Sequence, residues 1–501
     1  MGDAGQDEGT RGRGARDGSP AAQETYDTGR AVMLAVVAAI GGFLFGFDTA
    51  VINGAVDAIR ADFGMGAGLT GFAVSSALIG CAIGAWTAGQ LAERHGRIRV
   101  MLLASVFFTV SAIGSGLARG PWDLIGWRLL GGLAVGAASV IAPAYIAEIS
   151  PASIRGRLGS LQQLAIVTGI FVALLSDYFI ATGAGGAGDP FWLGLEAWRW
   201  MFFTAAVPAI AYGALALGIP ESPRYLVAQG QIERARGVLA QVLRSGVDAR
   251  MKEIRRTVKE DARASMADLK GPALGLLPIV WIGIGLSLFQ QFVGINVIFY
   301  YSSSLWQQVG FTESDALVQT VITSVTNIAV TVVAIALIDR IGRRRLLLIG
   351  SAGMVVSLGA LAAAFATAPV VDGEPALQGA GGPVALVAAN LFVVFFGMSW
   401  GPAVWVLLGE MFSNRIRASA LGLAAAAQWG GNFLVSTTFP ALAGVGLGLA
   451  YGLYTAFAAL SFVFVKRFVP ETRGVQLEDM GDDGRAAVAG DEPRDEGRLA
   501  A

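Results

Sequence analysis

Residues 290–301 read Gln-Gln-Phe-Val-Gly-Ile-Asn-Val-Ile-Phe-Tyr-Tyr and lie inside a long apolar run that begins near Leu276. Two adjacent glutamines and an asparagine are costly in such a run unless they face protein or water. Because each residue turns a helix by about 100°, Gln290 and Asn296 would lie far apart around an unbroken helix. A break at Gly294 would let these amides face one cavity.

The amides offer paired donors and acceptors, which match those of sugar hydroxyls. The stretch therefore predicts a membrane-embedded site for a neutral polyhydroxylated solute. The alternative is a set of amides that satisfy one another between packed helices.

The composition indicates a membrane protein. Of 501 residues, 54% are hydrophobic and only 15% are charged, which is too apolar for a soluble chain of this size. The formal net charge of −1 indicates no nucleic-acid partner. A single cysteine, Cys81, and a single histidine, His95, predict neither a disulfide nor a metal centre.

Twelve apolar segments are long enough to cross a bilayer core of about 30 Å. They are 31–53, 69–92, 98–118, 122–148, 160–182, 196–219, 273–303, 316–340, 345–367, 382–412, 416–441 and 446–468. The predicted division is a disordered tail at 1–29, a six-helix bundle at 30–220, a helical linker at 221–270, a second bundle at 271–473 and a disordered tail at 474–501. We therefore expect an all-α membrane protein.

Arginine sets the expected orientation. The loops after the second, fourth, eighth and tenth segments are rich in arginine, whereas the alternate loops 183–195 and 368–381 hold no basic residue. By the positive-inside rule, both tails and the linker are expected in the cytoplasm.

The two halves repeat three charged motifs in the same order. Glu93-Arg94-His95-Gly96-Arg97 matches 339–343, the segment that starts at Glu148 matches the one at Glu410, and Pro220-Glu221 matches Pro470-Glu471. This order predicts a duplicated transporter whose two pseudo-symmetric six-helix bundles rock about a site at the midplane.

These motifs resemble the sugar porter family of the major facilitator superfamily. The resemblance covers roughly residues 31–475 and is carried by GGFLFGFDTAVINGA at 41–55, RLLGGLAVG at 128–136, PESPR at 220–224, QQFVGIN at 290–296, WGPAVW at 400–405 and PETRG at 470–474. Within the family, the bacterial D-xylose/proton symporters are most alike and the facilitative glucose transporters more distant. The resemblance implies alternating access between two bundles.

The resemblance also implies a set of sugar-binding residues. They are Phe45, Gln163, Gln290, Gln291, Asn296, Tyr300, Asn327, Trp405, Gln428 and Trp429. Amides can bond hydroxyls while aromatic faces pack on the C–H face of a pyranose. Gln162 precedes Gln163, and the residues alone do not choose between them; the family pattern favours Gln163. The xylose symporter has a further glutamine where this chain has Ile170, which argues against xylose.

The duplicated charges are implied to close the inner face when the transporter opens outward. They are Arg97, Glu148, Arg155 and Glu221 in the first half and Arg343, Glu410, Arg417 and Glu471 in the second. Topology and helix-end charges explain most of the arginines, but not the paired glutamates.

Two charges, Asp48 and Arg128, fall within apolar segments. A charge at that depth costs at least about 2.5–3.5 kcal/mol, so a role in proton coupling is favoured over a static ion pair. Ala205 stands where the xylose symporter has an acid, so one member of the implied charge cluster is missing.

The leading hypothesis is a monosaccharide transporter of the D-xylose or D-glucose class, driven by proton symport. A proton-independent hexose uniporter and a non-transporting sugar sensor are the alternatives; the short tails argue against the sensor. We expect no enzyme activity and no cofactor. The expected partners are the monosaccharide, the proton and the lipid bilayer. A monomer is expected in the bacterial plasma (inner) membrane.

Overall fold

The computed structural model describes residues 25–151, 154–261, 269–371, 374–375, 377, 379–412 and 416–472. The first half comprises α1 (Thr28–Ala50), α2 (Ile52–Asp62), α3 (Ala67–His95), α4 (Arg97–Gly116), α5 (Pro121–Ile149), α6 (Arg155–Ala184), the short 3₁₀ helix η2 (Trp192–Gly194) and α7 (Ala197–Ala216). Three shorter helices follow: α8 (Pro223–Ala228), α9 (Ile232–Val242) and α10 (Val247–Asp261).

The second half repeats this plan. It comprises α11 (Pro278–Phe292), α12 (Ile295–Gln308), α13 (Glu313–Ile341), α14 (Arg343–Ala366), α15 (Gly381–Gly397), α16 (Trp400–Met411), α17 (Arg417–Val445) and α18 (Leu447–Phe468). Between α14 and α15, the strands β1 (Val370–Val371) and β2 (Glu374–Pro375) form a small antiparallel hairpin.

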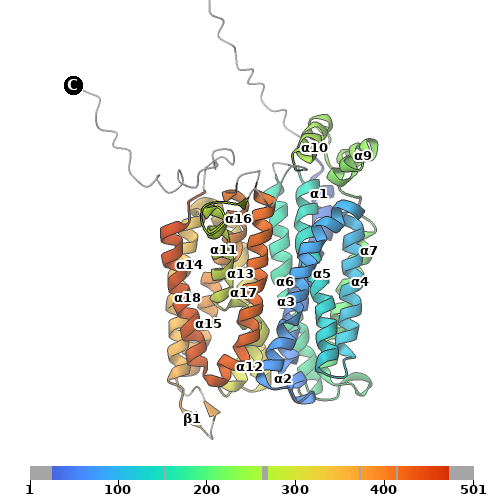
Figure 1. Ribbon diagram of the computed structural model, residues 1–501. Coiled ribbons are helices and arrows are strands. Elements are labelled where there is room, and N and C mark those ends of the chain that lie inside the picture. Colours follow the sequence, from blue (N-terminus) through green and yellow to red (C-terminus); the bar gives the residue numbers. More distant parts are fainter. Residues whose placement is uncertain are drawn as a thin grey trace, which may run out of the picture.

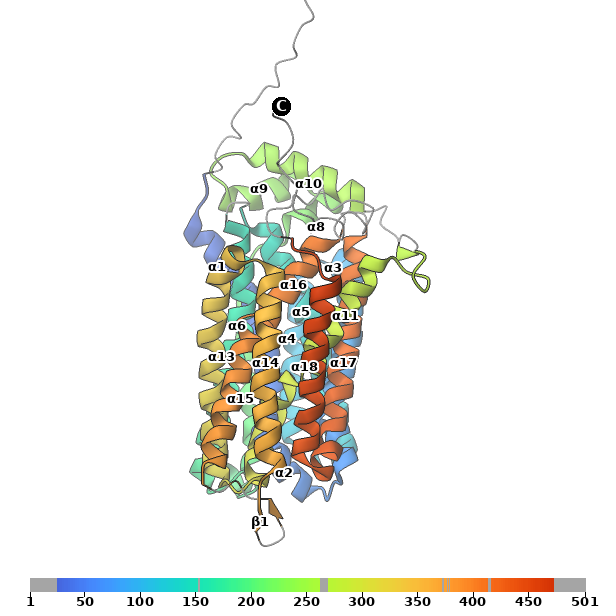
Figure 2. The same ribbon diagram turned by 90° about the vertical axis from the view of Figure 1, so that its left-hand side faces the viewer.

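The long helices run side by side, and α8, α9 and α10 lie at one end of the bundle (Figure 1). We call this the linker end. The opposite end, where α2, α12 and β1 lie, is called the far end (Figure 2). In Figure 1 the helices α4, α5 and α7 lie on the right and α14, α15 and α18 on the left, so the two halves stand next to each other.

The helices suit a membrane. Among the described residues, ten helices are long and apolar enough to cross one, with α1–α2, α11–α12 and α15–α16 each counted as a single helix. The remaining long helices, α7 and α17, pack in the same bundle against α4 and α3. Large apolar side chains such as Val356 (72% exposed) and Val463 (60% exposed) face outward, as expected where lipid replaces water. The predicted twelve-span fold is confirmed.

Glycines let pairs of helices touch through their backbones. A Cβ atom on Gly132 of α5 would lie 1.9 Å from the carbonyl oxygen of Ala77 in α3, and one on Gly136 would lie 2.1 Å from that of Cys81. Gly46 of α1 meets α6 in the same way, 1.9 Å from the carbonyl oxygen of Ile166. Such close approach drives helix association where no hydrophobic effect acts between helices. The glycine-rich segment 131–136 therefore serves helix packing.

The first span is longer than predicted. The sequence was expected to leave the membrane after residue 53, with a loop at 54–68, but α2 continues the helix to Asp62. Val51, between α1 and α2, keeps helical dihedral angles of φ −57° and ψ −25°. The polar residues Asn53 and Asp57 bond to the other half of the protein.

The close contact of α3 and α5 gives a test of the packing. Replacing Gly132 by alanine forces the two backbones apart, and overpacking of this kind costs about 1–3 kcal/mol. We expect a lower unfolding temperature, measured by thermal denaturation in detergent. Gly126→Ala in the same helix is the control, because no atom lies within 4 Å of a Cβ there. Equal unfolding temperatures for the two variants would contradict the packing argument.

Candidate functional site

The interruption predicted at Gly294 is present. The helix α11 ends at Phe292, and α12 begins at Ile295. Gly294 has a φ of +81°, in the left-handed region that favours glycine. A Cβ atom there would also lie 2.6 Å from the ring of Tyr454. Both the backbone angle and the lack of space therefore require glycine at the break.

The break brings the three amides of the stretch together. Asn296 Nδ2 donates to Gln291 Oε1 at 2.5 Å, and Gln291 Nε2 donates to Gln290 Oε1 at 3.3 Å. Gln290 Nε2 in turn donates to the backbone carbonyl of Trp400 at 2.8 Å. Gln290 and Gln291 are 3% and 5% exposed. The predicted convergence is confirmed, and the amides also satisfy one another, as the alternative interpretation required.

Trp400 marks a second helix break, which the sequence analysis missed. The predicted single span 382–412 is in fact two helices: α15 ends at Gly397 and α16 begins at Trp400. Ser399 between them has dihedral angles of φ −131° and ψ −83°. Gln290 donates to the carbonyl at the start of α16, so the first broken helix is bonded to the second at its break. In the sequence, a serine between Gly397 and Gly401 could have indicated this break.

The buried ion pair lies in the other half. Arg128 Nη1 donates to Asp48 Oδ2 at 3.2 Å and to the Asp48 carbonyl at 3.0 Å. The two side chains are 2% and 9% exposed. The guanidinium also lies 5.9 Å from the centre of the Phe202 ring in α7. Ala205, one turn further along α7, adds no charge, so the pair stands without the acid that the xylose symporter has there.

Tyr300 links the two regions. A small cavity of about 10 Å³ is lined by Tyr300 of α12 together with Arg128 and Thr49 of the first half. The Tyr300 hydroxyl also accepts from Asn432 Nδ2 at 3.4 Å. Asn432 was missed from the sequence, although it lies one helical turn after Gln428. The second half thus contacts the surroundings of the ion pair through the same helix that holds Asn296.

The other predicted contacts are spread over several helices, and one pair of them crosses between the halves. Phe45 of α1 packs on Trp429 of α17, with ring centroids 5.7 Å apart. Asn327 is 8% exposed and lies beside Gly397 at the second break. The Gln428 Oε1 atom is buried and has no hydrogen-bond partner in the described structure. Trp405 is 42% exposed.

The structure separates the two neighbouring glutamines of α6. Gln162 is 8% exposed, packs against Gly42, and its two amide atoms are buried without a described partner. Gln163 is only partly buried. The choice of Gln163 over Gln162 stays a prediction.

At the linker end, the duplicated charges of the first half form one cluster. Arg97 binds Glu148 through two donors, Nη2 at 2.8 Å and Nε at 3.1 Å. Glu221 accepts from the backbone amides of Arg97 at 2.9 Å and Ile98 at 3.2 Å, at the first turn of α4. Ser222 donates to Glu148.

The second half repeats the cluster. Arg343 Nη2 binds Glu410 at 2.8 Å, and Glu471 accepts from the amides of Arg343 at 3.0 Å and Arg344 at 3.2 Å. Thr472 takes the place of Ser222 and donates to Glu410 at 2.6 Å. Each ion pair therefore joins helices within one half. The side chains of Arg155 and Arg417 lie outside the described residues.

At the far end, hydrogen bonds join the two halves. Asn53 of α2, which is fully buried, donates to the carbonyl of Phe299 at 3.0 Å and accepts from the amide of Ser303 at 3.2 Å. Ser303 Oγ also donates to the Asn53 carbonyl at 2.6 Å. These bonds hold α2 against α12, the second segment of the broken helix. In this conformation the two halves are closed together at the far end.

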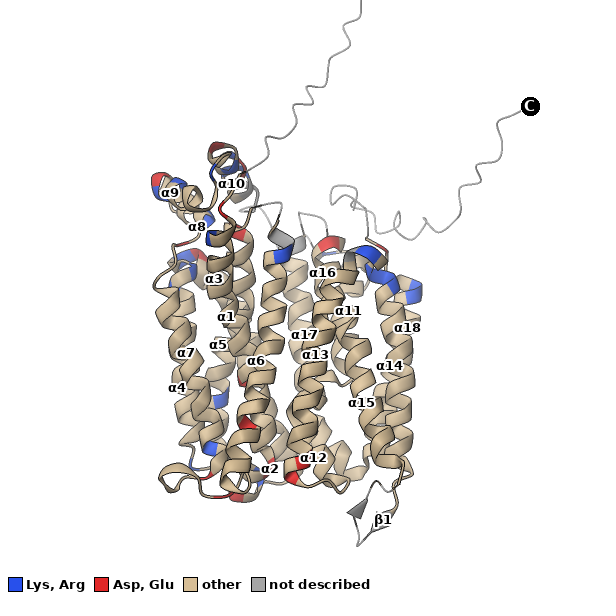
Figure 3. Ribbon diagram, turned by 180° about the vertical axis from the view of Figure 1, so that it is seen from behind, with Lys and Arg blue, Asp and Glu red and all other residues tan. Residues whose placement is uncertain are grey.

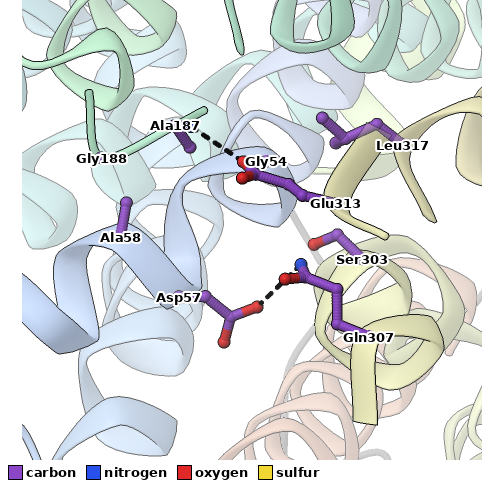
Figure 4. Close-up of a pocket in the computed structure, with 9 residues that line it drawn as sticks. All are labelled: Gly54, Asp57, Ala58, Ala187, Gly188, Ser303, Gln307, Glu313 and Leu317. Atoms are coloured by element: carbon purple, nitrogen blue, oxygen red, sulfur yellow. Dashed lines mark hydrogen bonds between the residues drawn. The ribbon is translucent and has the colours of Figure 1, made fainter. Parts of the chain in front are cut away.

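A pocket of about 120 Å³ lies beside this contact (Figure 4). Asp57 accepts from Ser304 at 2.6 Å and from Gln307 at 3.4 Å, and Glu313 accepts from the Ala187 amide at 2.8 Å. Two carboxylates therefore join first-half to second-half elements around the pocket.

The sequence analysis overlooked one further buried charge, Asp177 of α6. It is fully buried, and neither carboxyl oxygen has a hydrogen-bond partner among the described side chains. Asp177 packs against Gly54 of α2, where a Cβ atom would lie 2.7 Å from the Asp177 Cβ. Because Asp177 lies inside the predicted span 160–182, it could have been recognised from the sequence as an acid within the membrane.

Two six-helix bundles, broken helices with polar side chains at their interface, and a buried ion pair define a membrane transporter of the major facilitator type. The chain belongs to the sugar (and other) transporter family, whose model matches residues 34–483. This confirms the family resemblance.

Several relatives are similar over nearly their full length. The chain is 60% identical to the glucose transport protein of Synechocystis sp. over 92% of this chain and 99% of that protein. It is 37% identical to the D-xylose-proton symporter of Escherichia coli K12, over 91% and 96%. The solved inward-open structure of the E. coli xylose transporter has 37% identity and a TM-score of 0.75, with 89% and 98% of the two chains covered.

The Asn53 contact gives a test of far-end closure. Asn53→Ala removes the three hydrogen bonds of its side-chain amide to α12, each worth about 0.5–1.5 kcal/mol, so the state open at the far end should gain population at least about tenfold. Spin labels placed in each half at that end would report longer distances. Thr438→Ala is the control, because that hydroxyl bonds only its own helix. Unchanged distance distributions in Asn53→Ala would show that Asn53 does not hold the far end closed.

Proposed function

We propose that this protein imports a monosaccharide by proton symport through alternating access. The observation that carries the proposal is the juxtaposition around Tyr300. The amide cluster of the broken helix lies in one half, the Asp48–Arg128 pair lies in the other, and Tyr300 adjoins Arg128. A change at the sugar site can therefore reach the ion pair when the halves move.

Glucose is the favoured substrate. The relative with 60% identity is named a glucose transport protein, whereas the D-xylose-proton symporter is 37% identical. A solved structure of a proton:xylose symporter, 36% identical with a TM-score of 0.75, holds 6-bromo-6-deoxy-D-glucose, so a glucose analogue also binds to a relative that is named for xylose. Ile170 also removes the glutamine that the xylose symporter carries there.

Sugar binding would use the amides that now bond one another. A pyranose hydroxyl can replace the Asn296–Gln291 bond, because a hydroxyl both donates and accepts. Gln290, which binds the Trp400 carbonyl, would hold the second break beside the sugar. Phe45 and Trp429, whose rings pack across the two halves, would cover the apolar face of the sugar. Gln163, Asn327, Trp405 and Gln428 complete the proposed set.

Asp48 would carry the proton. Its charge is compensated by Arg128 at 3.2 Å, and a buried charge whose partner moves away must be neutralised or hydrated. A movement that separates the pair therefore favours proton uptake, and one that restores it favours release. If the pair is static or Ala205 leaves coupling incomplete, the protein is a uniporter.

The duplicated clusters would control opening at the linker end. Arg97 forms an ion pair with Glu148 inside the first half, and Arg343 forms one with Glu410 inside the second half. Each half can therefore move as a unit. We place the linker end in the cytoplasm of a bacterial plasma membrane on the arginine content of its loops. We also propose that the protein is a monomer.

Replacing Gln291 by alanine tests the sugar site. The variant loses the amide that would donate to and accept from sugar hydroxyls, so we expect at least about tenfold weaker glucose affinity with normal folding. Isothermal titration calorimetry in detergent measures the affinity. Gln308→Ala, an exposed glutamine at the end of α12, is the matched control. Wild-type affinity in Gln291→Ala would remove this residue from the site.

Asp48→Asn tests proton coupling. The variant cannot exchange a proton at this position, so accumulation of glucose driven by an inward proton gradient should fall to the background level. Equilibrium counterflow requires no net proton movement and should continue. Both are measured by radiolabelled uptake in proteoliposomes. A wild type that accumulates nothing would identify a uniporter, and a variant that accumulates normally would show that Asp48 is not the coupling site.

A further inference from the structure

The two halves differ in charge where their other features repeat. At the linker end, α14 begins with Arg344 and Arg345, and α18 ends with Lys466 and Arg467. We call these four residues the basic rim. The equivalent positions in the first half are Ile98, Arg99, Ala216 and Leu217, by the offsets of 246 and 250 residues that relate Arg97 to Arg343 and Glu221 to Glu471. The first half therefore has one basic residue at the positions where the second half has four.

The rim is a single surface shared by two helices. Arg344 Nη2 donates to the carbonyl of Lys466 at 2.8 Å, so the start of α14 is tied to the end of α18. Figure 3 shows basic residues at the linker-end tips of these two helices. Arg345, Lys466 and Arg467 are exposed and form no ion pair with the described residues.

Ordinary explanations leave part of the rim unexplained. Cations in the last turn of a helix suit its dipole, which accounts for Lys466 and Arg467. Arg345 lies in the first turn of α14, where a cation is disfavoured, and the two acids at this helix start bind Arg343 and the backbone amides. Membrane topology does not require this density either, because the first half has only Arg99 at the matching positions. An anionic partner would account for all four.

The surroundings indicate which anion. Phe468, Val463 and Leu460 of α18 are 51%, 60% and 54% exposed, so apolar side chains extend from the rim along the outer surface of the bundle. A basic group above a lipid-facing apolar surface matches a phospholipid, with its phosphate on the cations and its acyl chains on the helix. A soluble anion would use only the first of these features.

We propose that the basic rim binds the headgroup of an anionic phospholipid, such as phosphatidylglycerol, in the leaflet at the linker end. The lipid bridges α14 and α18 beside the Arg343–Glu410 cluster. The site is separate from the sugar and proton sites, so the proposal stands or falls independently of the proposed function.

Native mass spectrometry of the full chain, incubated with equal amounts of phosphatidylglycerol and phosphatidylcholine, tests the proposal. We expect the wild type to retain phosphatidylglycerol preferentially. The variant Arg345→Gln/Lys466→Gln/Arg467→Gln should lose most of this preference, at about fivefold for each cation removed. The matched control Arg94→Gln/Arg99→Gln/Arg234→Gln removes three exposed arginines at the same end of the first half and linker and should keep the preference.

Other outcomes would overturn the proposal. Equal losses in the two triple variants would indicate general attraction between charges and lipid. Displacement of the lipid by glycerol 3-phosphate at equal concentration would show that the acyl chains contribute nothing. The wild type could instead show no preference for phosphatidylglycerol until the acidic residues between positions 478 and 496 are neutralised. That result would show that the basic rim binds the chain's own acidic tail and not a lipid.

Discussion

A lipid bilayer offers no hydrogen-bonding partners, so backbone groups inside it must be satisfied by the protein or by enclosed water. This constraint decides where the helices can break. The breaks at Gly294 and Ser399 are close enough for Gln290 to bind the Trp400 carbonyl at 2.8 Å. Asn296 and Gln291, brought together by the first break, bond at 2.5 Å. The polar groups that a substrate would need are thus concentrated beside the two helix breaks.

Charged side chains inside the protein are likewise paired with partners that the protein itself supplies. Asp48 is held by Arg128 inside the first half, and the clusters at the linker end combine an ion pair with a carboxylate that caps a helix start. In each half that carboxylate, Glu221 or Glu471, receives two backbone amides. Gly96 and Gly342, with φ of +94° and +95°, let the carboxylate approach the chain closely. The duplication is therefore preserved in the geometry as well as in the motifs.

The contacts between the halves show how the broken helix can take part in opening. Asn53 binds α12 at the far end, and Tyr300 of the same α12 lines a cavity with Arg128. Because α12 is separated from α11 by the Gly294 break, this short segment can change its position without moving the whole span. A binding site that includes residues of α12 can therefore respond when the far end opens or closes.

The sequence by itself determined the membrane class, the twelve spans, the duplication, the break at Gly294 and the Asp48–Arg128 pair. These features follow from hydropathy and from the cost of polar groups in lipid, which act on each segment separately. Only the tertiary structure decided the second break at Ser399, the extension of the first span to Asp62, the different exposures of Gln162 and Gln163, and the contacts of Asn53. Each of these features depends on which face of a helix meets another helix. In the sequence, a polar residue that bonds across such an interface cannot be distinguished from a polar residue in a loop.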